Sequence, residues 1–139
     1  MKMKIKFYSD NVTFPKRSYS TDGGLDLYMP CEGTIAPHTT EVYGLGLGVQ
    51  IPEGYTAMIV PRSSIAKKGL ILQTQLIDCG YTGEIHMIVT NSNNIPYSFN
   101  KDDRLGSLLI IPCLSPELEV VDEFEATERG SKGLGSTKA

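Results

Sequence analysis

The sequence predicts an all-β fold of the sandwich, barrel or jelly-roll type. Three observations predict it: short runs rich in β-branched residues, leucine and tyrosine, turn residues that separate these runs, and only one segment with helical character. The chain has 139 residues, of which 40% are hydrophobic and 21% are charged. This length and composition are typical of one globular domain.

Five segments predict strands because apolar or β-branched residues dominate them between turn signals. Residues 45–51 (LGLGVQI) place glycine repeatedly on one side, which indicates a close backbone approach or a bulge. The other four segments are 25–29, 55–60, 84–90 and 104–112. The turn signals between them lie at 30–33, 52–54, 91–94 and 100–103.

Residues 63–70 (SSIAKKGL) predict one short helix, with Ser63 or Ser64 as the N-cap and Gly69 at the end. Arg62 precedes this helix at a strand-to-helix junction, where free backbone N–H groups and a guanidinium together suit a phosphate. A plain helix cap is the alternative for the same residues.

The C-terminal segment differs from the rest of the chain. From Ser115 onward it is first acidic and then glycine-rich, ending in RGSKGLGSTKA. We therefore expect a body at 1–114 and an arm at 115–139 that becomes ordered on a ligand or on a neighbouring subunit; a frayed end is the alternative. A phosphate loop of the Walker type is excluded, because Ser136 stands where that motif requires lysine.

Composition narrows the class of protein further. The formal net charge of −3 argues against a duplex nucleic-acid binder, and three widely spaced cysteines indicate reduced thiols rather than a disulfide framework. Two isolated histidines do not suggest a metal cluster, and no segment resembles a membrane span or a signal peptide. We expect a cytoplasmic protein, or one in the host cytoplasm for a viral chain.

Two aspartates lie beside apolar residues, where a charged carboxylate is energetically unfavourable without a partner. Asp78 directly follows Leu76 and Ile77, and Asp26 lies in an apolar strand after two glycines. A carboxylate beside apolar neighbours is unfavourable unless a partner pairs with it, so both are candidate functional groups. By contrast, Asp102 and Arg104 are expected in a solvated turn.

Five stretches, in this order, resemble the five motifs of the trimeric dUTPase family (deoxyuridine 5′-triphosphate nucleotidohydrolases), which includes viral and phage members. They are GGLDLYMPCEGTIAP, PRSSIAKKGL, LIDCGYTGEI, DDRLGSLLI and RGSKGLGST. The resemblance runs from about Asp22 to Thr137. The related dCTP deaminases share the fold and parts of these motifs.

The resemblance implies a jelly-roll, β-clip-like subunit and a homotrimer whose three sites are each built from all three chains, with the arm exchanged between subunits. It implies hydrolysis of dUTP with Mg2+ to dUMP and pyrophosphate, which keeps uracil out of DNA and supplies dUMP for thymidylate synthesis. No membrane or direct nucleic-acid partner is expected. The alternatives are a regulatory or binding protein of the same fold and a dCTP deaminase relative.

By the same resemblance, Asp78 deprotonates the water that attacks the α-phosphorus. Tyr81 lies against the deoxyribose and excludes a 2′-hydroxyl, while uracil is read mainly by backbone groups around Leu76, Ile77 and His86.

The resemblance implies that two groups of residues bind the phosphates. Arg62, Ser63 and Ser64 lie near the α- and β-phosphates. Arg129 reaches the γ-phosphate with help from the glycine-rich end of the arm, namely Gly135, Ser136 and Thr137. Asp26 supports the Mg2+ shell indirectly, through water.

Five positions depart from the usual family pattern. Gln75 and Leu76 stand where Gly-Val is usual, and Ser107 replaces a glutamine that helps to position metal-bound water or phosphate. Leu134 replaces a phenylalanine that stacks on uracil, and Lys138 replaces a glycine. These changes bear on the efficiency of the site more than on its reaction class.

Overall fold

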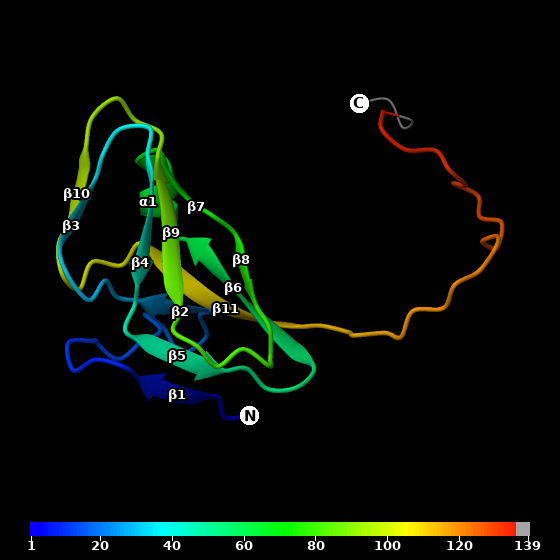
Figure 1. Cartoon of the computed structure of the whole chain (residues 1–139), viewed down its shortest axis with the longest axis horizontal. Coiled ribbons are helices and arrows are strands. Elements are labelled where there is room, and N and C mark those ends of the chain that lie inside the picture. The colour runs from blue at the N-terminus through cyan, green and yellow to red at the C-terminus, as the bar shows by residue number, and fades with distance from the viewer. Residues whose placement is uncertain (136–139) are drawn as a thin grey trace.

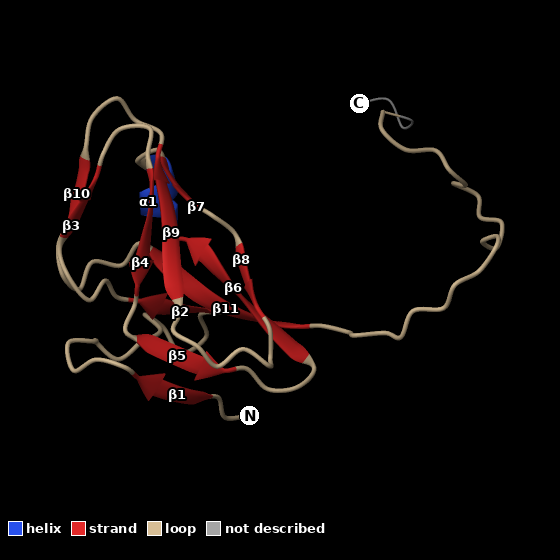
Figure 2. Cartoon of the chain, in the orientation of Figure 1, coloured by secondary structure: helices blue, strands red, loops and turns tan. Residues whose placement is uncertain are grey.

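The computed structural model describes residues 1–135 and confirms the all-β jelly-roll prediction (Figures 1 and 2). A compact β body is followed by an arm that runs away from it (Figure 1). The strands are β1 (Lys4–Phe7), β2 (Gly24–Leu27), β3 (Gly33–Ile35), β4 (Thr40–Gly44), β5 (Leu47–Gln50), β6 (Tyr55–Pro61), β7 (Leu70–Leu72), β8 (Gln75–Ile77), β9 (His86–Asn91), β10 (Tyr97–Phe99) and β11 (Gly106–Pro112). The helix α1 (Ser63–Lys67) lies between β6 and β7.

All the strand pairs among the described residues are antiparallel. The larger sheets have the orders β2-β11-β6-β8 and β4-β9-β7, and two ribbons, β1-β5 and β10-β3, complete the body. Buried side chains from both larger sheets form one hydrophobic cluster, which includes Leu108 and Ile59 from the first and Met87 and Leu72 from the second. The two sheets therefore share one core, as a jelly roll requires.

The five predicted strands are all present, with bounds that differ by at most two residues. Six further strands did not show in the sequence pattern. Four of these, β3, β7, β8 and β10, have only three residues each, which is too few to display an alternation.

The predicted helix is present, but its N-cap differs from the predicted one. Its N-cap is Arg62, in an extended conformation and without a side-chain cap bond, so the prediction of Ser63 or Ser64 as the cap is wrong. The reason is that the Arg62 carbonyl already accepts the first-turn N–H groups of Ile65 and Ala66. Gly69 has a φ of +75° and ends the helix as predicted, since that region favours glycine.

The arm leaves the body after β11 and contains no helix or strand over residues 113–135. Its large apolar side chains are almost completely exposed: Leu118, Val120 and Phe124 have exposed fractions of 93–98%. Ser136, Thr137 and Lys138 lie outside the described residues. Within residues 1–135, no helix has the length and apolar character needed to span a membrane.

Candidate active site

Asp26 anchors a cluster of cationic side chains. On β2 it is only 8% exposed, and its Oδ2 accepts a hydrogen bond from Arg104 Nη1 at 2.9 Å. Its Oδ1 accepts one from Ser107 Oγ at 2.8 Å and lies 3.8 Å from Arg62 Nε. Ser107 reaches it because the register of β2 and β11 places these two residues opposite each other. The carboxylate thus holds two guanidinium groups in place.

The prediction that Arg104 belongs to a solvated turn is wrong, because its guanidinium pairs with Asp26. The two residues are 78 positions apart, so only the pairing of β2 with β11 reveals the contact. Asp102 does lie in an exposed turn. There the hydroxyl of Thr13, followed by the ammonium of Lys101, lowers the pKa of Asp102 and favours the carboxylate form.

These cations line a pocket of about 290 Å³ at the start of α1. Its basic side chains are Arg62, Lys68 and Arg104, and the lining also includes Ser64 and the acidic residues Asp102 and Asp103. Because no side-chain cap bond serves the first turn of α1, backbone N–H groups of that turn also point toward this end. Such a pocket suits a polyanion with several phosphate oxygens.

Replacing Asp26 by asparagine is expected to lower the free energy of unfolding by about 2 kcal/mol, because it leaves two guanidinium groups near a neutral amide. The loss is smaller than for a fully buried pair, since both arginines remain partly hydrated. Thermal unfolding at fixed protein concentration should show a midpoint lower by about 4–8 °C. The exposed Glu53, changed to glutamine, is the matched control. An unchanged midpoint in Asp26→Asn would contradict the anchoring role.

Asp78 lies directly after β8, at the start of a tight turn, with its side chain exposed. The Tyr81 N–H donates to the Asp78 carbonyl at 3.0 Å, which closes the turn. The Tyr81 hydroxyl then donates to the Glu84 carbonyl at 2.7 Å. A Cβ at Gly83 would meet the Tyr81 hydroxyl at 2.6 Å and the ring at 2.7 Å, so the glycine makes room for this side chain. The loop of residues 78–85, which connects β8 to β9, is called the hairpin below.

The hairpin rests on the strand β5 and on the loop before it. The Tyr8 hydroxyl donates to the Thr82 carbonyl at 2.7 Å, and Gly46 N–H donates to Glu84 Oε1 at 2.7 Å. A Cβ at Gly48 would meet the Gly83 carbonyl at 2.7 Å, so the close backbone approach predicted for this segment is confirmed. Sequence reasoning missed the supporting roles of Tyr8 and Glu84, whose partners are 74 and 38 residues away.

A small pocket of about 120 Å³ opens beside this hairpin. For comparison, an engineered cavity of about 150 Å³ admits benzene, so this space suits a single six-membered ring. His86 lines it, with Nε2 at 4.0 Å from Glu84 Oε2. The full lining is Gln75, Leu76, Ile77, Tyr81, Glu84, Ile85 and His86, so four residues predicted at the base and sugar lie together here.

The cationic pocket and the ring-sized pocket do not meet within one chain. Ile77 pairs with Ala57 on β6, Asp78 lies one residue beyond, and Arg62 lies five residues farther along in the opposite direction. At about 3.3 Å per residue, Asp78 and Arg62 are separated by about 20 Å. Figure 1 shows the same separation: α1 lies beyond one end of β6, and the segment after β8 lies near the other end.

Arg129, Leu134 and Gly135, the predicted site residues of the arm that the structure describes, line neither pocket. Arg129 donates from Nε to the Lys132 carbonyl at 3.0 Å, within a local turn. Leu134 is fully exposed, and Gly135 has a φ of +74°. The structure of this chain alone therefore does not bring the described part of the arm, residues 115–135, to either pocket.

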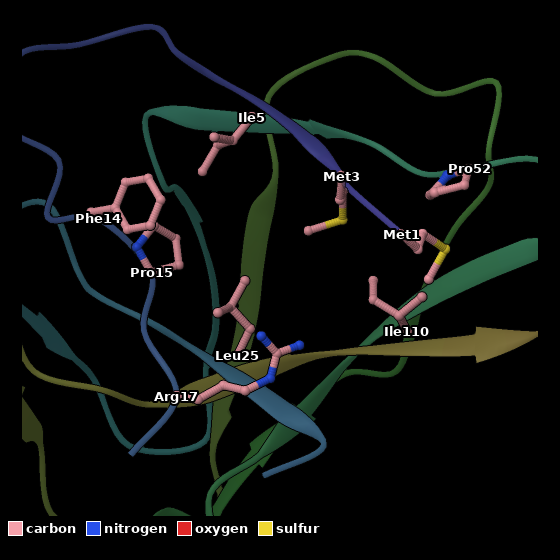
Figure 3. A pocket seen from close by; sticks show the side chains of 9 residues that line it. All are labelled: Met1, Met3, Ile5, Phe14, Pro15, Arg17, Leu25, Pro52 and Ile110. Carbon is pink, nitrogen blue, oxygen red and sulfur yellow. The ribbon is translucent and has the colours of Figure 1, made fainter. Parts of the chain in front are cut away.

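A third cavity, of about 320 Å³, lies under β1 (Figure 3). Met3, Ile5, Leu25 and Ile110 give it an apolar lining, and the guanidinium of Arg17 lies among them (Figure 3). None of the predicted site residues lines it. Its apolar character suits a segment of protein better than a phosphate.

The side chains of residues 1–135 offer no group of three or more His, Cys, Asp or Glu that could hold a metal ion. Asp26 has both oxygens engaged by Arg104 and Ser107. These residues fit an ion whose ligands are mostly phosphate oxygens and water, which is how Mg2+ is usually held beside a polyphosphate.

The chain is therefore an all-β protein with two separate pockets, called half-sites below: one is lined by Arg62, Lys68 and Arg104, and the other is of the size of a six-membered ring. Residues 10–138 match the family model of the dUTPases, and the chain belongs to that family.

Relatives with the same family name cover nearly the whole chain. The deoxyuridine 5′-triphosphate nucleotidohydrolases of Yarrowia lipolytica and Nautilia profundicola are each 35% identical over 140 residues, which covers 99% of this chain and 89% and 99% of theirs. A mutant dUTPase of Staphylococcus bacteriophage 80alpha, solved with dUpNHpp, is similar at a TM-score of 0.93, with 28% identity and 99% of both chains covered. A mutant of the dUTPase from phage phi11 of S. aureus, solved with a structural Mg(II) ion, has a TM-score of 0.85 and 27% identity, with 91% of this chain and all of that chain covered.

Proposed function

We propose that this chain hydrolyses dUTP to dUMP and pyrophosphate, with Asp78 as the general base. The observation that carries the proposal is an exposed carboxylate at the start of a rigid hairpin beside a pocket of ring size. Family membership and relatives named as deoxyuridine triphosphate nucleotidohydrolases support the reaction class.

Asp78 orients a water molecule and takes its proton as the water attacks the α-phosphorus. A general base must lie within hydrogen-bond reach of the proton that it removes, so its position must be fixed relative to the nucleotide. The hydrogen bond from the Tyr81 N–H to the Asp78 carbonyl supplies this fixation from within the turn. The contact of Tyr8 with Thr82 supplies it from outside.

The nucleoside lies in the hairpin pocket. The uracil meets backbone groups near Leu76, Ile77 and His86, and the sugar lies on Tyr81. Because the Tyr81 ring is fixed by its hydroxyl on the Glu84 carbonyl, it cannot move aside for a 2′-hydroxyl. A hydroxyl pressed against that ring would also lose its hydrogen bonds to water.

The phosphates lie in the cationic pocket, where Arg62, Ser63 and Ser64 contact the α- and β-groups. Asp26 keeps Arg62 directed toward them and would support the Mg2+ shell indirectly, through water. Mg2+, when bound to the triphosphate, neutralises negative charge and favours departure of pyrophosphate. The structural Mg(II) ion of the phi11 relative supports a role for this ion in the family.

The two half-sites act together only when subunits associate, and the active form is a homotrimer. The separation of about 20 Å between Asp78 and Arg62 supports this, because one α-phosphate cannot lie beside both residues of the same chain. Each complete site takes the hairpin from one subunit and the cationic pocket from another. The arm, with Arg129, Leu134 and Gly135, closes the site from the third; Ser136 and Thr137 act with them.

The arm, residues 115–139, is exchanged onto a neighbouring subunit in this proposal. Its nearly fully exposed Leu118, Val120 and Phe124 need an apolar surface, and the cavity under β1 offers one. Among the described strands β1 pairs only with β5, so one edge of β1 is free to pair with an added strand. The lysines of the KMKIK segment at 2–6 complement the acidic residues of the arm.

A nucleotide panel tests the function. Purified protein is incubated with dUTP, UTP, dTTP or dCTP, each with and without Mg2+, while pyrophosphate and ammonia are measured. The proposal expects rapid pyrophosphate release from dUTP with Mg2+ and no ammonia from dCTP. Ammonia release from dCTP would favour the dCTP deaminase alternative. No release of pyrophosphate or ammonia from any of the four nucleotides would favour a regulatory protein of this fold.

The regulatory alternative has one specific observation in its favour. The dUTPase of phage 80alpha is described as controlling transfer of virulence genes by a G protein-like mechanism. That relative was solved with the analogue dUPNHPP. A regulatory role in this chain would therefore accompany nucleotide binding rather than replace it. The site of action expected from the sequence is the cytoplasm, where free dUTP is available.

Tyr81→Ala is expected to reduce the preference for dUTP over UTP by about tenfold, because an aromatic wall that rejects one hydroxyl contributes roughly a hundredfold at most. The ratio of kcat/KM for the two nucleotides is the measurement. Tyr81→Phe keeps the ring but loses the hydrogen bond to Glu84 that fixes it, so its preference should fall between those of the wild type and Tyr81→Ala. An unchanged ratio in Tyr81→Ala would place the sugar elsewhere.

A further inference from the structure

We propose that the side-chain amide of Gln75 reads the base, by hydrogen-bonding the imide edge of the pyrimidine in the ring-sized pocket. The inference deepens the proposed function and rests on it, because it names a specificity-determining residue of the same site. Gln75 stands where dUTPases usually have glycine, so this contact adds a side chain to a readout made mainly by backbone groups.

The position of Gln75 directs its side chain inward. It begins β8 and pairs with Ile59, whose side chain is buried. Side chains alternate along a strand, so Gln75 shares a face with the buried Ile77, while Leu76 points the opposite way and is 63% exposed. An apolar residue would be the ordinary occupant of such a position. The chain instead places an amide there, at the wall of the pocket.

The amide lacks a partner for its oxygen. Gln75 Oε1 is buried and makes no hydrogen bond with any of the described residues. A buried acceptor without a partner destabilises the folded protein, and such groups in native proteins usually serve a ligand, an ion or a water molecule. The pocket beside Gln75 supplies the space for a ligand ring.

The chemistry of uracil fits this orphan acceptor. The imide edge of uracil presents the N3–H donor between two carbonyl acceptors, and a primary amide presents one acceptor next to one donor. Gln75 Oε1 accepts from N3–H, while Nε2 donates to the adjacent carbonyl. The last torsion of a glutamine side chain is broad, so the amide can turn toward the ring at little conformational cost.

Gln75→Met tests the inference, because methionine has a similar length and no strong acceptor or donor. The KM for dUTP and the Kd for dUpNHpp, measured by titration calorimetry with the full-length protein, should rise about 3- to 10-fold. The value of kcat should change less than about twofold, since the contact is made equally in the ground state and the transition state. The thermal midpoint should stay constant or rise, because the variant removes an unpaired buried polar atom.

Gln73→Met is the matched control, two residues earlier in the same segment. The Gln73 amide is exposed and already donates to Thr90 Oγ1 at 2.9 Å, and it does not line the pocket. Its replacement should leave the Kd for dUpNHpp unchanged.

Two outcomes would overturn the inference. An unchanged Kd in Gln75→Met would mean that water, not the base, serves the amide. A loss of affinity together with a lower thermal midpoint would mean that the amide supports the fold. A wild-type protein that binds dUpNHpp but does not hydrolyse dUTP would instead contradict the proposed function, and the Kd comparison would still decide the role of Gln75.

Discussion

Asp78→Asn is expected to lower kcat for dUTP by about 10²- to 10⁴-fold, the usual contribution of a general base. The amide is almost the same size as the carboxylate but does not accept the proton of the attacking water. The side chain is exposed at the turn, so the substitution leaves no buried group without a partner and should not disturb the fold. Pyrophosphate release under saturating dUTP and Mg2+ gives the rate.

Binding separates a catalytic role from a structural one. The Kd of Asp78→Asn for dUpNHpp should stay within about threefold of the wild type, because Asp78 acts on water rather than on the nucleotide. Asp10→Asn, an exposed carboxylate in the turn after β1, should retain both rate and affinity. A normal rate of pyrophosphate release in Asp78→Asn would show that Asp78 is not the general base.

Truncation after Leu114 is expected to abolish most activity, with a loss of at least about 10²-fold in kcat/KM. The reason is that Arg129 and the closing segment supply charge stabilisation and water exclusion that no other part of the chain replaces. A variant that lacks only the residues from Arg129 onward should lose the activity but still form the trimer, since it retains the apolar residues 118–124. Light scattering should give the mass of a trimer for the variant that ends before Arg129 and a smaller mass for the variant that ends after Leu114.

Mixing two inactive variants tests whether the site is shared between subunits. Asp78→Asn chains keep the arm, and chains truncated before Arg129 keep Asp78. If the hairpin and the arm come from different chains, random mixed trimers at equal amounts should contain about a quarter of the normal number of complete sites. No recovery of activity after subunit exchange would show that each chain completes its own site.

The long strands could be predicted from the sequence because they have enough residues to display a pattern. β6 and β11 have seven residues each, and their apolar runs lie between clear turn signals. The KMKIK alternation at residues 2–6 overlaps a strand, β1, but this strand has only four residues. The three-residue strands are defined by their partners, and no local pattern specifies them.

The site was predictable as a set of motifs but not as a set of contacts. Asp78 and Tyr81 lie on the same turn, so their proximity follows from the sequence alone. The pairing of Arg104 with Asp26 depends instead on the register of β2 and β11. The contacts of Tyr8 and Glu84 with the hairpin depend likewise on how separate strands stack. Such long-range pairs emerge only from packing.

The most direct measurement is a crystal structure of the full-length protein with dUpNHpp and Mg2+. The account predicts the uracil ring in the pocket formed by residues 75–86, with its imide edge on the Gln75 amide. It also predicts a water molecule between the Asp78 carboxylate and the α-phosphorus, in line with the bond that breaks, and Arg62 of a second subunit on the phosphates. A nucleotide bound with its base outside that pocket, or with Asp78 beyond hydrogen-bond reach of any water near the α-phosphorus, would contradict it.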